Sequence, residues 1–221
     1  MWNIYMKVVL RSANKPNLDE ENILWSAGYS NVCGIDEVGR GCWAGPIVAG
    51  AVIFGAKVNI TAKELWQIND SKKITPKKRE QLAGFIIHNA RHWGIGFVVS
   101  KELDKIGLSK ANTLAMERAV QNLGNKPDFC LIDGNVIRKS PVIGLFKNII
   151  KGDTISISIA AASILAKVFR DKLMKSVDEQ YPEYGFKKHK GYGTNMHRKS
   201  ILKNGILPIH RKSFAPIKEL L

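Results

Sequence analysis

Five short apolar runs constrain the fold of this chain more than any other feature of its sequence. They predict strands at residues 32–35, 47–54, 95–99 and 129–132, and a fainter fifth at 147–151. The second run is rich in β-branched residues, which favour extended backbone. Helical patterns separate the later runs, so we expect an α/β fold in which helices cover the faces of a mixed five-stranded sheet.

The helical segments have recognisable ends. Thr75 is an N-cap residue followed by Pro76 at the first helical position, which predicts a helix from there to about residue 92. Further helices are expected, in chain order, from about residue 109 to 124, from about 156 to 177, after Thr194 and after Ala215. Alanines at 160–162 would let the longest helix lie close to the sheet.

The length of 221 residues favours one structural unit with a full core. Residues 1–30 are polar and irregular, and we interpret them as an N-terminal lead-in segment. Residues 31–180 form the predicted α/β domain, and residues 181–221 form a C-terminal helical extension to it.

The chain is strongly basic, with 34 Lys and Arg residues against 19 Asp and Glu residues and a formal charge of +15. That charge favours a polyanionic partner, either nucleic acid or an anionic membrane surface. The longest apolar stretch, 47–54, is too short to span a bilayer, and residues 1–10 lack the apolar core of a secretory signal. We therefore expect a soluble, cytoplasmic protein that binds nucleic acid.

The three cysteines contain no Cys-x-x-Cys pair, which fits a reducing compartment and argues against structural zinc. We expect Cys33, Cys42 and Cys130 to be buried thiols.

The first candidate site is Asp36-Glu37, which ends an apolar run and is followed by Gly39, Arg40 and Gly41. Carboxylates at a strand end suit a hard divalent cation, and a glycine-flanked arginine suits a phosphate close to backbone N–H groups. Acidic pairs at strand ends are usually solvated turn residues, however, and Gly-x-Gly is common in loops. The segment from Asp36 to Gly41, taken alone, leaves both interpretations open.

Two later aspartates, Asp133 and Asp153, also end or follow β-like runs. Ligands of α/β sheets collect at the carboxyl ends of strands, so we expect these acids to converge with Asp36 and Glu37. Four converging carboxylates would need Mg²⁺ or Mn²⁺ to stay ionised, and two ions about 4 Å apart suit in-line attack on a phosphodiester. Neighbouring strand residues point to opposite faces, so Asp36 and Glu37 can share the site only if the strand twists or breaks there, and Gly39 would permit such a break.

Several ordered motifs resemble those of the ribonuclease HII family, and the similarity covers about residues 32–218. The motifs are Gly34-Ile35-Asp36-Glu37-Val38-Gly39-Arg40-Gly41, Ala44-Gly45-Pro46, Asp70-Ser71-Lys72-Lys73, Leu131-Ile132-Asp133-Gly134-Asn135, Lys151-Gly152-Asp153, residues 161–171, His189-Lys190-Gly191-Tyr192-Gly193-Thr194 and residues 210–216. Arg40 between the glycines, and the short segment before them, point away from the sister family, ribonuclease HIII. Cys42-Trp43 departs from the Pro-Leu expected there, so the turn after Gly41 is expected to differ in shape.

The resemblance implies a ribonuclease H-like fold and an enzyme that cuts the RNA strand of RNA–DNA hybrids. It also implies nicking of duplex DNA 5′ to an embedded ribonucleotide, which leaves 3′-hydroxyl and 5′-phosphate ends and serves ribonucleotide removal from DNA. The resemblance implies that the metal-binding catalytic residues of this chain are Asp36, Glu37, Asp133 and Asp153. Gly39, Arg40 and Gly41 would recognise the ribose 2′-hydroxyl and its phosphate, and Tyr192 would pack on the next sugar. Without the resemblance, we would interpret Tyr192 as an ordinary aromatic residue in a glycine-rich turn.

Four further residues are candidates for contact with the nucleic-acid backbone, because hydroxyl, amide and ammonium groups on loops and helix starts commonly bind phosphate. They are Lys72, Asn112, Thr113 and Lys151, each of which could equally be a solvated surface residue. The basic clusters at 187–190 and 197–199 favour a groove for duplex backbone. Asp171 could support the metal site or balance charge on its helix, and we leave it outside the catalytic set.

Three function classes remain to be compared. The first is a two-metal endonuclease whose partners are RNA–DNA hybrids and ribonucleotide-containing duplex DNA. The second is a basic, non-catalytic duplex-binding protein, which leaves the four acidic motifs unexplained. The third is a metal nuclease of the same fold that does not distinguish ribose from deoxyribose (a ribose test), and this class leaves residues 39–41 and Tyr192 unexplained. For the first we expect a monomer with no membrane association and no obligate protein partner.

Overall fold

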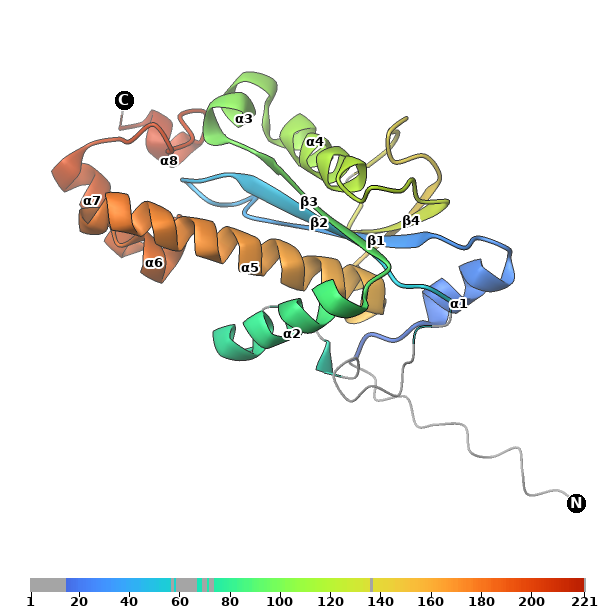
Figure 1. The fold of residues 1–221 in the computed structure, drawn as a ribbon. Helices are drawn as coiled ribbons and strands as arrows, with labels where there is room; N and C mark the ends of the chain where they lie inside the picture. Colours follow the sequence, from blue (N-terminus) through green and yellow to red (C-terminus); the bar gives the residue numbers. More distant parts are fainter. Residues whose placement is uncertain are drawn as a thin grey trace, which may run out of the picture.

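The computed structural model describes residues 15–56, 58, 67, 68, 71, 74–135 and 137–220. Its strands are β1 (Val32–Val38), β2 (Ile47–Ile53), β3 (His92–Val98), β4 (Phe129–Asp133) and β5 (Phe146–Ile149). They form one sheet in the order β3-β2-β1-β4-β5 (Figure 1). The pairs β1–β2 and β2–β3 are antiparallel, whereas β1–β4 and β4–β5 are parallel. The predicted mixed five-stranded sheet is confirmed.

Helices cover both faces of the sheet (Figure 1). They are α1 (Asp19–Ser26), α2 (Pro76–Asn89), α3 (Ser100–Ile106), α4 (Leu108–Gln121), α5 (Ile157–Gln180), α6 (Phe186–His189), α7 (Asn195–Asn204) and α8 (Ala215–Lys218), with 3₁₀ turns η3 (Gly152–Thr154) and η4 (Pro182–Tyr184). On one face α4 packs against the sheet through a cluster that includes Ile35, Ala115 and Met116. On the other face α2 and α5 share a cluster that includes Leu82 and Ala161. The helical C-terminal region lies beyond one end of the sheet, which confirms the predicted extension.

The longest helix, α5, contacts the sheet at the level of the backbone. A Cβ atom on Gly34 of β1 would lie 2.1 Å from the carbonyl carbon of Ser158, and one on Gly50 of β2 would lie 2.3 Å from the carbonyl oxygen of Ala162. Glycine in the strands and small residues in the helix therefore allow the close approach that the alanine run predicted. Ser156 is the N-cap of the helix, and its side chain accepts a hydrogen bond from the Ile159 amide at 3.2 Å.

The N-terminal segment is more regular than expected, because Asp19–Ser26 forms helix α1. Its Glu21 is fully buried and accepts hydrogen bonds from the hydroxyls of Ser156 and Ser158 at 2.6 Å and from the Ser158 amide at 2.9 Å. Burial raises the pKa of this carboxyl. The expectation of irregular structure is wrong for α1, because its anchor is a partner more than 130 positions away in the sequence. The division at residues 30 and 180 stays a prediction.

Two further expectations concern compartment and thiols. No helix in the described part of the chain is both long and apolar enough to cross a bilayer. Cys33, Cys42 and Cys130 are free and buried, which confirms the predicted state of the thiols.

Candidate active site

The carboxyl ends of two neighbouring parallel strands bring the first acids together. The last paired residues of β1 and β4 are Ile35 and Ile132, so Asp36 and Asp133 follow at the same edge of the sheet. β1 stays paired with β2 through Val38 and ends before Gly39, so the strand does not break between Asp36 and Glu37, and the alternative of a twist stays a prediction. The Glu37 amide donates to the Asp36 carboxylate at 2.7 Å, which fixes one acid relative to the other.

The acids influence one another electrostatically. Burial raises the pKa of Asp36 well above its ordinary value, and the neighbouring charges of Glu37 and Asp133 raise it further. Burial also raises the pKa of Glu37, against the lowering effect of Arg40, whose guanidinium lies 3.5 Å from the carboxylate. The structure therefore brings three of the four predicted acids into one cluster that has an excess of negative charge.

The fourth acid, Asp153, belongs to a turn that folds back on the end of β4. The Asp133 carboxylate accepts a hydrogen bond from the Gly152 amide at 2.6 Å, and Asp153 is the next residue, buried in η3. Lys151 precedes them with a left-handed φ of 56° and an exposed side chain. Because Asp133 binds the turn directly, the position of Asp153 depends on the end of the same strand.

The donor set fits a hard divalent cation. One oxygen of Glu37, Oε2, is buried without a hydrogen-bond partner, and so are both polar side-chain atoms of Asn112. A buried, unpartnered carboxylate oxygen beside acids of raised pKa is a place where added positive charge is favourable. Among the residues that the structure describes, no three His, Cys, Asp or Glu side chains form a preassembled metal-binding group.

A polar hollow of about 510 Å³ lies beside the acids. Its lining residues are Arg40, Ser109, Asn112, Thr113, Asn135, Arg138 and Lys139. The structure thus brings three predicted substrate residues to one place, at the start of α4. The other four lining residues were not among the residues predicted from the sequence. The adjacent pair Arg138-Lys139 soon after the Asp133 strand was the signal that could have found two of them.

The loop that carries Gly39, Arg40 and Gly41 contains two different kinds of glycine. Gly39 has a left-handed φ of 91°, and a Cβ atom there would lie 2.4 Å from Nε of Arg170. The fold therefore requires glycine at this position. At Gly41, by contrast, a Cβ atom would meet nothing within 4 Å, and φ is not in the left-handed region. The fold alone gives no reason for glycine at Gly41.

Two fully buried arginines bind the backbone of this loop and of the residues that follow it. Arg170 donates to the carbonyl oxygens of Pro46 at 3.0 Å, Lys190 at 2.8 Å and Ala44 at 3.1 Å. Arg211 donates to the carbonyl oxygens of Gly45 at 2.9 Å and 3.0 Å and of Arg40 at 2.8 Å. Neither arginine could be assigned a role from the sequence, because backbone carbonyl groups are present at every residue and do not mark a binding partner.

Tyr192 lies against the same loop. It forms an antiparallel bridge with Cys42, its side chain is 40% exposed, and its ring centroid is 5.9 Å from the Arg170 guanidinium carbon. The Trp43 indole covers Gly193, where a Cβ atom would lie only 2.2 Å from the ring. The unusual Cys42-Trp43 pair therefore packs against the segment that carries Tyr192.

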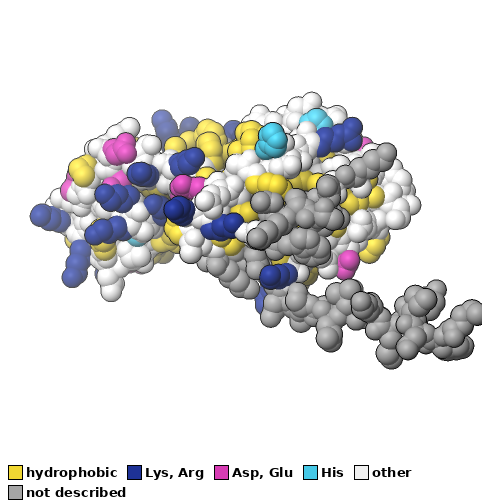
Figure 2. Space-filling view, turned by 60° about the horizontal axis from the view of Figure 1, so that its bottom comes forward, with side chains coloured by type: hydrophobic (Ala, Val, Ile, Leu, Met, Phe, Trp, Pro, Cys, Tyr) yellow, Lys and Arg dark blue, Asp and Glu magenta, His cyan; other side chains and the backbone are white. Residues whose placement is uncertain are grey.

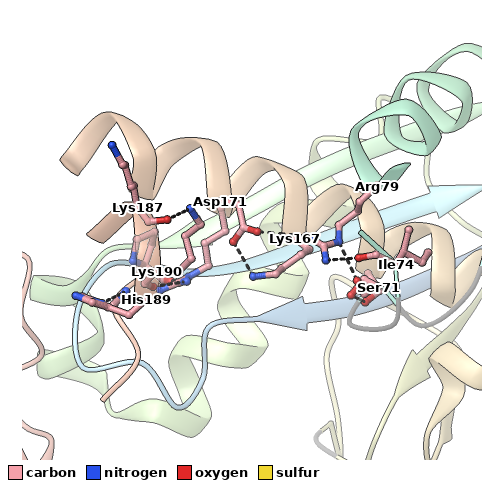
Figure 3. A network of polar contacts seen from close by, with 12 residues as sticks. Ser71, Ile74, Arg79, Lys167, Asp171, Lys187, His189 and Lys190 are labelled. Carbon is pink, nitrogen blue, oxygen red and sulfur yellow. Dashed lines mark hydrogen bonds and ion pairs between the residues drawn. The ribbon is translucent and has the colours of Figure 1, made fainter. Parts of the chain in front are cut away.

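Asp171 has a structural role. Its carboxylate pairs with Lys167 at 2.6 Å and with Arg79 at 3.4 Å, and so links α5 to α2 (Figure 3). This contact favours the second of the two roles that the sequence left open. Lys72 lies outside the described residues, as do Asp70 and Lys73 of its motif.

Comparison with known proteins identifies the family. The model of the family described as ribonuclease HII matches residues 33–217. The chain belongs to the ribonuclease HII family. It is 46% identical over 208 residues to the ribonuclease HII of Dehalococcoides mccartyi, covering 93% of this chain and 95% of that protein. It is 48% identical over 198 residues to the enzyme of Thermotoga maritima, covering 90% of this chain and 79% of that protein.

A solved structure agrees with this family. The ribonuclease H2 of Pyrococcus horikoshii OT3 superposes with a TM-score of 0.71 at 27% identity, covering 86% of this chain and 96% of that one. The predicted resemblance and the ribonuclease H-like fold are both confirmed. The chain is a ribonuclease H, a nuclease of the hydrolase class that acts on RNA–DNA hybrids.

Proposed function

We propose that this ribonuclease HII also nicks duplex DNA on the 5′ side of an embedded ribonucleotide, leaving 3′-hydroxyl and 5′-phosphate ends. The observation that carries the proposal is the cluster of Asp36, Glu37 and Asp133, which the Arg40–Glu37 ion pair joins to a loop where a Cβ atom at Gly41 would meet nothing within 4 Å. The cluster suits metal-assisted hydrolysis of a phosphodiester, and the open glycine suits close approach of a sugar-phosphate backbone. Such an activity would serve ribonucleotide removal from DNA in the cytoplasm.

The metal site would consist of Asp36, Glu37, Asp133 and Asp153. Mg²⁺ or Mn²⁺, as a pair of ions, would supply an activated water nucleophile and stabilise the leaving oxygen. The protein orients these acids through the Glu37 and Gly152 amides, which bind the Asp36 and Asp133 carboxylates. Arg40 beside Glu37 adds a positive charge on the side where a phosphate would lie.

The ribose test would use Gly39, Arg40, Gly41 and Tyr192. A 2′-hydroxyl is the group by which proteins distinguish RNA from DNA, and unhindered backbone can contact it directly. The 40% exposure of Tyr192 leaves its ring accessible to the next sugar.

Contacts of the protein with the nucleic-acid backbone would extend over the polar hollow and the basic surface. Asn112 and Thr113 would bind phosphate there, together with Lys151 on its exposed turn and Lys72. Figure 2 shows lysine and arginine side chains gathered toward the end where α5, α6 and α7 lie in Figure 1. We infer that hybrids and ribonucleotide-containing duplexes lie across this surface, with a monomeric enzyme and no obligate protein partner.

A substrate comparison tests the proposal. The substrates are an end-labelled DNA duplex with one ribonucleotide, the matching all-DNA duplex and a continuous RNA–DNA hybrid, each with Mg²⁺ or Mn²⁺ and with EDTA. We expect a metal-dependent nick 5′ to the ribonucleotide, cutting of the hybrid and an intact all-DNA duplex. Cutting of the hybrid without a nick at the single ribonucleotide would contradict the proposal. Equal cutting of the two DNA duplexes would indicate a nuclease without a ribose test.

Gly41→Ala tests the close approach. Because a Cβ atom at Gly41 meets nothing within 4 Å in the free protein, we expect its melting temperature to stay within about 2 °C of the wild type, as for a neutral surface substitution. The added methyl group would stand between the loop and the sugar, so we expect kcat/KM on the ribonucleotide duplex to fall on the order of 100-fold. Steady-state kinetics and thermal melting check both values. Wild-type kcat/KM would show that substrate does not approach this face.

A further inference from the structure

Three histidines of the C-terminal region pack together and contact the backbone of Gly191 and Tyr192. His189, His197 and His210 are all buried, and the rings of His189 and His197 stack with centroids 4.4 Å apart. The Nε2 atoms of His197 and His210 lie 3.0 Å apart. His189 and His197 belong to the two basic clusters predicted to form a groove for duplex backbone, but their burial excludes these two side chains from such a groove. The sequence assigned His210 no role.

The hydrogen-bond partners of His210 and His197 allow a proton to be assigned to one nitrogen of each ring. The Leu207 amide nitrogen lies 2.8 Å from Nδ1 of His210, closer than the Leu207 carbonyl oxygen at 3.3 Å, so we assign Nδ1 as the acceptor and the His210 proton to Nε2. That Nε2–H donates to Nε2 of His197, which places the His197 proton on Nδ1. His197 Nδ1–H then donates to the Tyr192 carbonyl oxygen at 3.0 Å. The chain of donors thus runs in one direction, from the Leu207 amide to Tyr192.

His189 completes the arrangement from the other side of the same dipeptide. Its Nδ1 accepts from the Gly191 amide at 3.2 Å, and its Nε2–H donates to the Tyr184 carbonyl oxygen at 2.9 Å. The backbone of Gly191 and Tyr192 is therefore bound by two histidines, one at the Gly191 N–H and one at the Tyr192 carbonyl. All three rings must be neutral for these bonds to form, and burial accordingly lowers the pKa of His197 and His210 to about 4.

The same tail also holds the glycine loop. His210 bridges Ala44, and the next residue, Arg211, donates to the Arg40 and Gly45 carbonyl groups. One dipeptide near the C-terminus thus contacts the loop of Gly39 to Gly41 and, through His197, the backbone of Tyr192. In Figure 3, His189 and Lys190 lie beside helix α5, on which Lys167 and Asp171 form an ion pair.

We propose that His189, His197 and His210 are positioning residues that hold the Tyr192 ring in the pose needed for ribose contact. This inference rests on the proposed function, because it assigns the histidines a role through Tyr192. The histidines touch no substrate themselves. They act on the part of Tyr192 that faces the protein, while its exposed ring faces the substrate.

A double-mutant cycle tests this role. His197→Leu removes the donor to Tyr192, His197→Asn keeps an amide N–H near the position of Nδ1, and exposed His88→Asn is the matched control. We expect His197→Leu to lower kcat/KM on the single-ribonucleotide duplex about tenfold, a size typical of small misplacement, and His197→Asn to recover part of the loss. In a Tyr192→Ala background the same substitution should change kcat/KM by less than about twofold, because the two effects are not additive.

The outcomes separate the inference from the function on which it rests. Equal losses from His197→Leu in both backgrounds would show a merely structural role and overturn the inference, while the loss from Tyr192→Ala would still support the ribose contact. No loss from Tyr192→Ala would overturn the contact and the positioning role together.

A spectroscopic measurement on the wild-type protein does not depend on whether the variants fold. Long-range ¹H–¹⁵N spectra of the imidazole rings distinguish a proton on Nδ1 from one on Nε2. We expect the Nδ1–H form for His197 and the Nε2–H form for His189 and His210 at pH 7. A charged ring at any of the three, or the Nε2–H form at His197, would overturn the proposed hydrogen-bond chain.

Discussion

Replacing Asp36 with asparagine is expected to lower the rate of cleavage by on the order of 10³-fold or more, as for other preorganised charged groups at reacting centres. Asparagine keeps the oxygen that accepts the Glu37 amide, so the local backbone should not move. It removes one negative charge from a cluster in which burial and the neighbouring acids raise the pKa of Asp36. Turnover of the ribonucleotide duplex, at the Mg²⁺ concentration that saturates the wild-type enzyme, measures the loss.

The same variant should be more stable than the wild type in the absence of metal. Like charges in a buried site oppose folding at neutral pH, so we expect unfolding to require about 1 kcal/mol more, the scale of a one-unit pKa shift. Glu80→Gln is the matched control, since Glu80 is an exposed acid on α2. A variant at Asp36 that is inactive and also unstable would indicate a structural acid rather than a functional one.

The second large effect is expected on stability, from Gly34→Ala. The new Cβ atom would lie 2.1 Å from the Ser158 carbonyl carbon, so α5 and β1 must separate. We expect a loss of about 3 kcal/mol in the free energy of unfolding, the upper part of the range for overpacked cores. Because Ser158 lies just after the turn that carries Asp153, activity should fall as well. Urea unfolding measures the loss.

Gly84→Ala is the opposite case and the control. Gly84 lies in the interior of α2, where a Cβ atom meets nothing within 4 Å. The substitution should therefore raise the free energy of unfolding by about 0.5 to 1 kcal/mol through helix propensity alone. Equal effects at Gly34 and Gly84 would show that contact with α5 does not explain the requirement for glycine in β1.

Most of the sheet could be predicted, because local apolar runs define its strands. The parallel pairing of β1 with β4 ends at Ile35 and Ile132, the last residues of the two predicted strands, so the convergence of Asp36 and Asp133 could be inferred from the topology. Helix α2 begins at the predicted N-cap, where the Thr75 side chain accepts from the Lys78 amide. The short helix α3 was missed, since only Gly107 separates it from α4.

What the sequence could not predict depends on partners distant along the chain. Glu21 binds Ser156 and Ser158, and Arg211 binds carbonyl groups near Arg40, which carry no side-chain signature. The burial of Glu37 Oε2 and the difference between Gly39 and Gly41 likewise follow from packing. The roles of Asp153 and Lys72 in the site stay predictions.

The central claim is that the acids at the ends of β1 and β4 form the metal site, and calorimetric titration with Mn²⁺ tests it most directly. The wild-type protein should bind at least one Mn²⁺ per chain and melt at a higher temperature when the ion is present. Asp36→Asn should show neither effect, while Glu80→Gln should show both. Equal Mn²⁺ binding by the wild type and Asp36→Asn would contradict the assignment of these carboxylates.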